Sequence, residues 1–227
     1  MSKIYYSKQT TYKIALSGIS LAIALVLNFF CSKFLTFPLA SFLKFDFSLT
    51  VVAVLAFWIG LPYAYIVILI LFAISPSYGS LGYSLIGVLG HFILACAQLI
   101  FVSLFYLFSL FFKKIHVKNI NWLILELFLA TVLATLILLF INTFLFTPWY
   151  FKLFNTLGNE PATYQSMIKN WDKIRGLFLN VDNYFLGTFI IYGSFNLINL
   201  ILNSIFTFII LKLNKKNNYI MQSAQLF

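Results

Sequence analysis

Long apolar stretches separated by short polar segments are the main pattern of this chain. The clear runs cover residues 14–35, 47–75, 85–112, 121–147 and 186–211. An α-helix needs about 20 apolar residues to cross about 30 Å of hydrocarbon, and each run reaches or exceeds that length. The pattern therefore predicts an all-α integral membrane protein.

The second run is longer than one crossing requires. It contains Gly60-Leu61-Pro62, and proline removes a backbone donor and disfavours helix in the residue before it. The run is either one long helix or two short helices that separate at this point.

The positions of the lysines favour two helices. With six spans, all three lysine clusters fall on the side of the N-terminus, whereas with five spans the second and third clusters fall on the opposite side. Cytoplasmic loops carry an excess of Lys and Arg, so we predict six spans with both termini in the cytosol. The clusters are Lys3, Lys8 and Lys13; Lys113, Lys114 and Lys118; and Lys212, Lys215 and Lys216.

One transmembrane domain over residues 1–227 is therefore expected. An external loop over 147–185 is long enough to be functional, although its aromatic residues are equally suited to anchoring at a bilayer edge. A short surface helix is expected within 160–176. The predicted spans are 14–35, 46–60, 61–76, 85–112, 121–147 and 186–211.

Composition supports the membrane class. The chain is 62% hydrophobic and 9% charged, whereas a soluble domain carries about 25% charged residues. The net charge of +10 is explained by topology rather than by nucleic acid, because most lysines flank apolar runs. Cys31 and Cys96 each lie in an apolar run and indicate neither a disulfide framework nor a metal site. The N-terminal apolar run is interpreted as an uncleaved first helix.

A polar stripe marks the last predicted helix. Its members fall within about 80° of arc at 100° per residue. They are Tyr192, Asn196, Asn199, Asn203 and Thr207.

Other spans show similar alignments. Thr131, Thr135 and Asn142 share a face of the fifth predicted helix, and His91 aligns with Gln98 in the fourth. These groups either bond neighbouring helices together or line a ligand pocket near the external end. Amides offer donor and acceptor without charge, which suits the edge of a neutral heterocycle, and aromatic rings suit its faces.

Ionisable residues are rare in the predicted spans. His91 is either a hydrogen-bonded interior histidine or a ligand contact, and Glu126 suits a contact at the bilayer surface or with another subunit. No chain of acids and histidines crosses the membrane to support ion-coupled pumping. The sequence shows no P-loop, HExxH, CxxC or GxSxG motif and no paired catalytic carboxylates, so we predict neither an enzyme nor a metal site.

The first external connection alternates apolar and polar residues over 43–48, which predicts an extended segment leading into the second helix. Asp46 or Ser48 is the expected N-cap, and Lys44 is a possible ion-pair partner of Asp46 at a pocket mouth. In the first helix, Gly18 and Ala22 form a small-xxx-small face that permits close helix approach.

The order of these features resembles the substrate-binding S component of an energy-coupling factor (ECF) vitamin transporter, and most closely the riboflavin-specific branch. Residues 42–48 are similar to that branch's Leu-x-x-Asp-Phe-Ser entry to helix two. Residues 141–151 resemble its Leu-Asn-Tyr-Phe … Pro-Leu-Tyr segment, and 195–199 its Phe-Asn-Ile-Ile-Lys segment. Gly82 and Gly90 match a glycine pair of the family.

The chain departs from the family pattern at several positions. Leu49-Thr50, Gly60-Leu61-Pro62 and Leu71-Phe72 replace family motifs, and Asn199 stands where the family has a flavin-holding lysine. These differences bear on which vitamin is bound more than on the class of protein.

The resemblance implies a six-helix subunit of a bacterial cell membrane that binds riboflavin or a related flavin from outside. It implies no catalytic site or cofactor in this chain, because partner ATPases use ATP and act through a transmembrane coupling subunit. The helix-one face of Ala15, Gly18 and Ala22 corresponds to the surface that meets the coupling subunit. The predicted substrate site is Asn142, Asn196, Asn199, Phe45, Asp46, Trp149, Tyr192 and His91.

Other readings remain open at this point. The first is an S component for a different vitamin or small heterocycle. The second is an integral membrane enzyme acting on lipid, for which His91, His116 and Glu126 are the scattered candidates. The third is a scaffold or channel subunit in which the polar stripe only bonds helices together.

Overall fold

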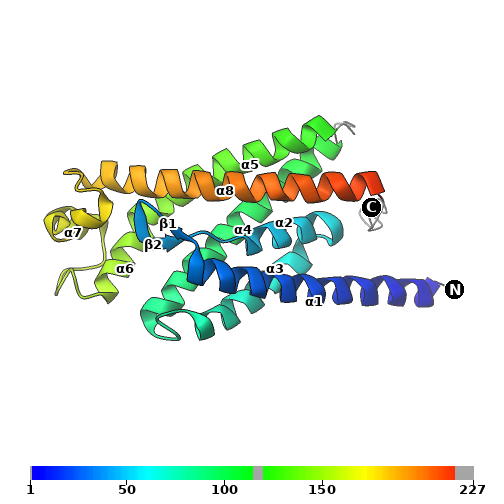
Figure 1. The fold of residues 1–227 in the computed structure, drawn as a ribbon, viewed down its shortest axis with the longest axis horizontal. Coiled ribbons are helices and arrows are strands. Elements are labelled where there is room, and N and C mark those ends of the chain that lie inside the picture. The colour runs from blue at the N-terminus through cyan, green and yellow to red at the C-terminus, as the bar shows by residue number, and fades with distance from the viewer. Residues whose placement is uncertain (1, 115–119, 218–227) are drawn as a thin grey trace.

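A computed structural model describes residues 2–114 and 120–217, and the side chains within 9–114 and 122–214. The fold is a bundle of apolar helices with a small β-hairpin and a folded loop at one end (Figure 1). The long helices are α1 (Ser2–Phe34), α3 (Leu61–Ile74), α4 (Leu85–Lys114), α5 (Ile120–Ile141) and α8 (Tyr184–Asn217). The shorter elements are β1 (Thr36–Phe37), β2 (Ala40–Lys44), α2 (Ser48–Ile59), η1 (Ser75–Tyr78), the π-helix η2 (Asn142–Phe146), α6 (Thr147–Leu153), α7 (Tyr164–Lys169), η3 (Trp171–Lys173) and η4 (Arg175–Phe178).

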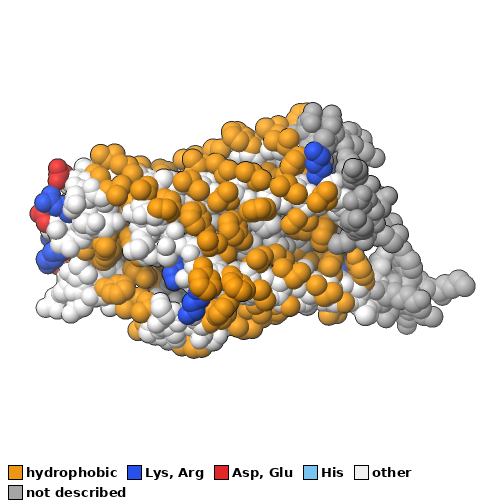
Figure 2. Space-filling model, viewed as in Figure 1, with side chains coloured by type: hydrophobic (Ala, Val, Ile, Leu, Met, Phe, Trp, Pro, Cys, Tyr) orange, Lys and Arg blue, Asp and Glu red, His pale blue; other side chains and the backbone are white. Residues whose placement is uncertain are grey.

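The described helices fit a multi-pass all-α membrane protein. Five helical segments are long and apolar enough to cross a membrane, and α2 is apolar but has only 12 residues. Large hydrophobic side chains are exposed on the flanks, as Figure 2 shows for one face. Such a surface is suited to contact with lipid rather than with water.

The chain separates into α2 and α3 at Gly60, where the sequence suggested two helices. Gly60 has φ 103°, a conformation that residues with a side chain rarely adopt, and Pro62 lies in the first turn of α3. In Figure 1 the start of α1 and the end of α8 lie together at one end of the bundle, and α6 and α7 lie at the other.

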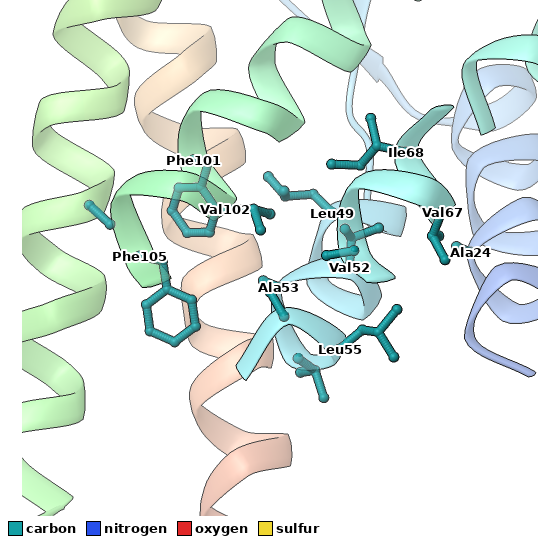
Figure 3. Close-up of a cluster of buried hydrophobic side chains, with 14 of the residues drawn as sticks. Ala24, Leu49, Val52, Ala53, Leu55, Val67, Ile68, Phe101, Val102 and Phe105 are labelled. Atoms are coloured by element: carbon teal, nitrogen blue, oxygen red, sulfur yellow. The ribbon is translucent and has the colours of Figure 1, made fainter. Parts of the chain in front are cut away.

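The main core surrounds α2. Leu49, Val52, Ala53 and Leu55 are buried on several sides of this helix, which packs against α1, α3, α4 and α8. Figure 3 shows these side chains beside others of the cluster, including Phe101 of α4. A helix that is apolar all round is one that is buried all round.

The fifth predicted span ends too early. Helix α5 continues through η2 into α6, so the apolar segment runs from Trp122 to Leu153 rather than stopping at 147. Pro148 cannot donate a helical hydrogen bond, and the π-helical turn immediately before α6 accommodates that loss without ending the helix.

The loop after α6 is folded. Helix α7 lies within the expected 160–176 stretch, and its N-cap Thr163 accepts a hydrogen bond from the Ser166 backbone N–H. Trp171 is buried within the protein, and its indole N–H donates to the Val181 carbonyl at 2.7 Å. The loop therefore has its own small core.

This second core joins the loop to the hairpin and to the start of α8. Phe178 lies at its centre, with its ring 5.8 Å from that of Phe42, 6.3 Å from that of Phe151 and 5.9 Å from that of Tyr192. The loop is thereby fixed against residues that line the cavity described below.

Candidate ligand-binding cavity

A cavity of about 250 Å³ is lined by residues of β2, η2 and α6 among others. Figure 1 shows these elements in the half of the bundle that lies away from the chain termini. Its volume is close to the lower end of small-molecule sites, which run from about 300 to 1,000 Å³. Its walls come from the last turns of α1, from β2 and the turn after it, from the loop at residues 79–82, and from parts of α4, α5, η2, α6 and α8.

Most of the predicted substrate residues meet in this one space. Trp149 is the exception: it lies on α6, is 40% exposed and does not line the cavity. Its ring packs 6.1 Å from that of Phe146, which does line it. The residues that line the cavity are Asn142, Asn196, Asn199, Phe45, Asp46, Tyr192 and His91.

Three amide residues that line the cavity have hydrogen-bonding capacity to spare. The Nδ2 of Asn196 is buried and has no hydrogen-bond partner. Asn142 is 6% exposed, and its side chain forms no hydrogen bond within the described part of the chain. The Oδ1 of Asn199 accepts a hydrogen bond from the backbone N–H of Asp46 at 3.2 Å. The Nδ2 of the same side chain has no described acceptor. Unpaired buried polar groups are costly, so a ligand that pairs with them gains affinity.

Asp46 is the centre of a hydrogen-bond network at the cavity wall. Its carboxylate accepts from Asn28 Nδ2 at 3.0 Å, Gln98 Nε2 at 2.7 Å and Ser48 Oγ at 2.6 Å. The network ties α1, α2 and α4 together, and Tyr78 extends it by donating to Asn28 Oδ1 at 2.7 Å. A buried carboxylate is tolerated when it is this fully hydrogen-bonded.

Two expectations about this segment are wrong. The N-cap of α2 is Phe47 rather than Asp46 or Ser48, although Asp46 Oδ1 does accept the Ser48 backbone N–H at 3.1 Å. Lys44 does not pair with Asp46, because the carboxylate is already occupied; the Lys44 ammonium donates instead to the Ser32 carbonyl oxygen.

The polar stripe of α8 divides into two parts. Asn196 and Asn199 face the cavity, whereas Asn203 bonds helices together: its Nδ2 donates to the Asp46 carbonyl at 2.9 Å, and its Oδ1 accepts from Thr50 at 2.8 Å. Next to Asn203 in α8, the Ser204 hydroxyl forms a hydrogen bond of 2.8 Å with the Thr131 hydroxyl of α5. One portion of the stripe therefore lines the cavity, and another holds neighbouring segments together.

Aromatic rings supply much of the remaining wall. Phe195 packs 5.8 Å from Phe45, and both line the cavity. Tyr150 lines it from α6, and the Tyr192 hydroxyl accepts from Thr147 at 2.8 Å. The cavity thus combines apolar faces with a few placed polar groups.

Several cavity residues escaped the sequence analysis. Asn28 is buried on α1, and its position as a lone amide in an apolar run was a usable signal. The close packing of the loop before α4 had no such signal in the sequence. Gly87, in the first turn of α4, is required because a Cβ there would lie 2.2 Å from the carbonyl oxygen of Gly82 in that loop. The predicted pair Gly82 and Gly90 does line the cavity.

Of the three candidates for an enzyme, the two described ones do not lie together. His91 lines the cavity, whereas Glu126 does not and accepts a hydrogen bond from Ser109 at 2.6 Å. His116 falls outside the described residues. Across 2–114 and 120–217, no group of three or more His, Cys, Asp or Glu side chains is placed to hold a metal ion.

No protein-family model matches this chain, and no curated protein matches its sequence.

Proposed function

We propose that this protein is the substrate-capture subunit, or S component, of an ECF-type vitamin uptake system, and that it binds riboflavin or a related flavin. The observation that carries the proposal is the cavity lined by Asn142, Asn196 and Asn199. The motif resemblance around residues 42–48, 141–151 and 195–199 is consistent with it.

The chemistry of the cavity suits a flavin. One edge of the isoalloxazine ring alternates carbonyl oxygens with ring nitrogens, and carboxamides can donate to the former and pair with the latter. The faces of the ring are apolar and aromatic, and Phe45, Phe195 and Tyr150 are available to pack against them. The amides and the aromatic rings therefore divide recognition between the edge and the faces.

In this proposal the protein is a bacterial membrane subunit that spans the bilayer six times, with both termini in the cytosol and the cavity accessible from outside. The chain supplies no catalytic group or cofactor, because two partner ATPases provide the energy through a coupling subunit. Ala15, Gly18 and Ala22 would meet that subunit. All three are exposed, and a Cβ added at Gly18 would meet no atom within 4 Å.

A flavin titration of the purified full-length protein tests the proposal. Riboflavin fluorescence should be quenched on binding, and Asn196→Leu should weaken binding about tenfold or more, because the variant keeps the bulk and loses the amide. Thr135→Val is the matched control. Its hydroxyl is also buried and unpartnered, but it does not line the cavity, so riboflavin affinity should not change.

If neither riboflavin nor riboflavin 5′-phosphate binds, the flavin assignment is wrong. If a panel of other vitamins also fails to bind, substrate capture as a whole is wrong, and the polar residues serve helix packing instead.

A further inference from the structure

The charges that line the cavity are unequally available to a ligand. Lys44 and Asp46 are its only Lys, Arg, Asp or Glu residues among the described ones. They come from neighbouring positions of the same segment, yet they do not pair with each other.

The negative charge is fully occupied. Asp46 is 2% exposed, and its two carboxylate oxygens together accept hydrogen bonds from Asn28, Gln98, and the hydroxyl and backbone N–H of Ser48. A carboxylate surrounded by donors in this way has little capacity left for an organic cation.

The Lys44 ammonium has hydrogen-bond donors left for a ligand. An ammonium group has three donors, and the one described hydrogen bond of Lys44 goes to the Ser32 carbonyl in the last turns of α1. Within the described side chains, no carboxylate lies close enough to form an ion pair with it. Lys44 is only partly buried, so its ammonium can reach a ligand at the side of the cavity next to α1.

The amides lie on other elements. Asn142 belongs to η2 at the end of α5, and Asn196 belongs to α8, whereas Lys44 stands beside α1. Figure 1 shows α1 and α5 on opposite flanks of the bundle, with the hairpin between them. A ligand that contacts all of these groups presents an uncharged edge to the amides and a different group to the lysine.

From this arrangement we infer that the natural ligand carries an acidic group, a phosphate or a carboxylate, which the Lys44 ammonium holds. The inference rests on the proposed function and narrows its substrate, riboflavin or a related flavin, to a flavin with an anionic end. A charge-assisted hydrogen bond at a partly desolvated site is stronger than a neutral one, so the acidic group contributes to selection as well as to affinity.

The experiment compares riboflavin with riboflavin 5′-phosphate, which differs only by the terminal acidic group. Both are titrated against the full-length protein in an uncharged detergent. The wild type should bind the phosphate form about tenfold or more tightly than riboflavin, and Lys44→Gln should reduce that ratio by about the same factor. Lys44→Arg should retain the preference because it retains the charge.

Lys33→Gln is the matched control. Lys33 lies in the last turn of α1 beside Ser32, and the substitution also removes one positive charge. Lys33 is exposed and does not line the cavity, so the ratio of the two affinities should not change. Using the ratio also separates ligand recognition from a role of Lys44 in holding the end of α1, because a structural loss would weaken both flavins equally.

Each outcome has a distinct meaning. If riboflavin binds and the phosphate form binds no more tightly, or if Lys44→Gln weakens both equally, the inference is wrong and the proposed function stands. If neither flavin binds, the flavin assignment is wrong and the inference falls with it.

Discussion

At the scale of single residues, the sequence identified the cavity amides better than the network beside them. Asn196 and Asn199 could be found because helical spacing places them on one face. That Asp46 accepts from Asn28 and Gln98 could not be found, because those partners lie 18 and 52 residues away and nothing local pairs them. Tertiary packing, rather than spacing, brings such groups together.

The Asp46 network should stabilise the protein measurably. Asp46→Asn keeps the shape but replaces an acceptor oxygen by a donor, so at least one of the surrounding N–H or O–H groups loses its acceptor. Hydrogen bonds to charged groups contribute about 1.5–3 kcal/mol, and a loss of that order should lower the thermal unfolding midpoint in detergent.

Asp172→Asn controls for the same chemical change at a surface position, where the side chain is 88% exposed beside Arg175. Its unfolding midpoint should match the wild type. Equal midpoints for Asp46→Asn and the wild type would show that the network does not hold the helices together.

At the scale of elements, helix existence was predictable and helix ends were not. Apolar run length located the long helices, and Gly60-Leu61-Pro62 located the separation of α2 from α3. The helix of the fifth predicted span continues past 147, because the π-helical turn before Pro148 accommodates a residue that usually ends a helix. The folded core around Trp171 and Phe178 carried no periodic signal at all.

The exposed face of α1 carries a prediction of its own. If it meets a coupling subunit, Ala22→Leu should strongly reduce vitamin uptake by cells that express the complete transporter, because added bulk prevents close helix approach. Flavin binding by the isolated protein should not change, since Ala22 is exposed and does not line the cavity.

Ala73→Leu adds the same bulk to an exposed position of α3 and should leave uptake intact. Equal uptake by the two variants would place the coupling contact elsewhere on the bundle.

At the scale of the whole molecule, the two ends of the bundle differ. The start of α1 and the end of α8 share one end, and α6 and the folded loop lie toward the other (Figure 1). The cavity is lined by α6 and lies in that half. Capture of a solute from outside requires that the loop end face the exterior. The lysine distribution favours this orientation, since Lys113 and Lys114 close α4 at the end with the chain termini.

Cysteine labelling in cells tests the orientation. In a background with Cys31→Ala and Cys96→Ala, Gln165→Cys on α7 should react with a membrane-impermeant maleimide on intact cells. Lys114→Cys at the end of α4 should react only after the membrane is permeabilised. The reverse pattern would place the cavity on the cytosolic side and contradict uptake.

The shortness of α2 has a geometric consequence for how deep a solute can enter. A helix of 12 residues rises about 18 Å, which leaves about 12 Å of the hydrocarbon thickness uncovered. In the six-span arrangement proposed above, the hairpin would cover part of that remainder, and its non-helical backbone is permissible at such a depth only where protein or an internal hollow shields it from lipid. In that arrangement the short α2 and the cavity beside Asp46 would be two aspects of one construction, and the length of α2 would set how far below the headgroups a bound molecule lies.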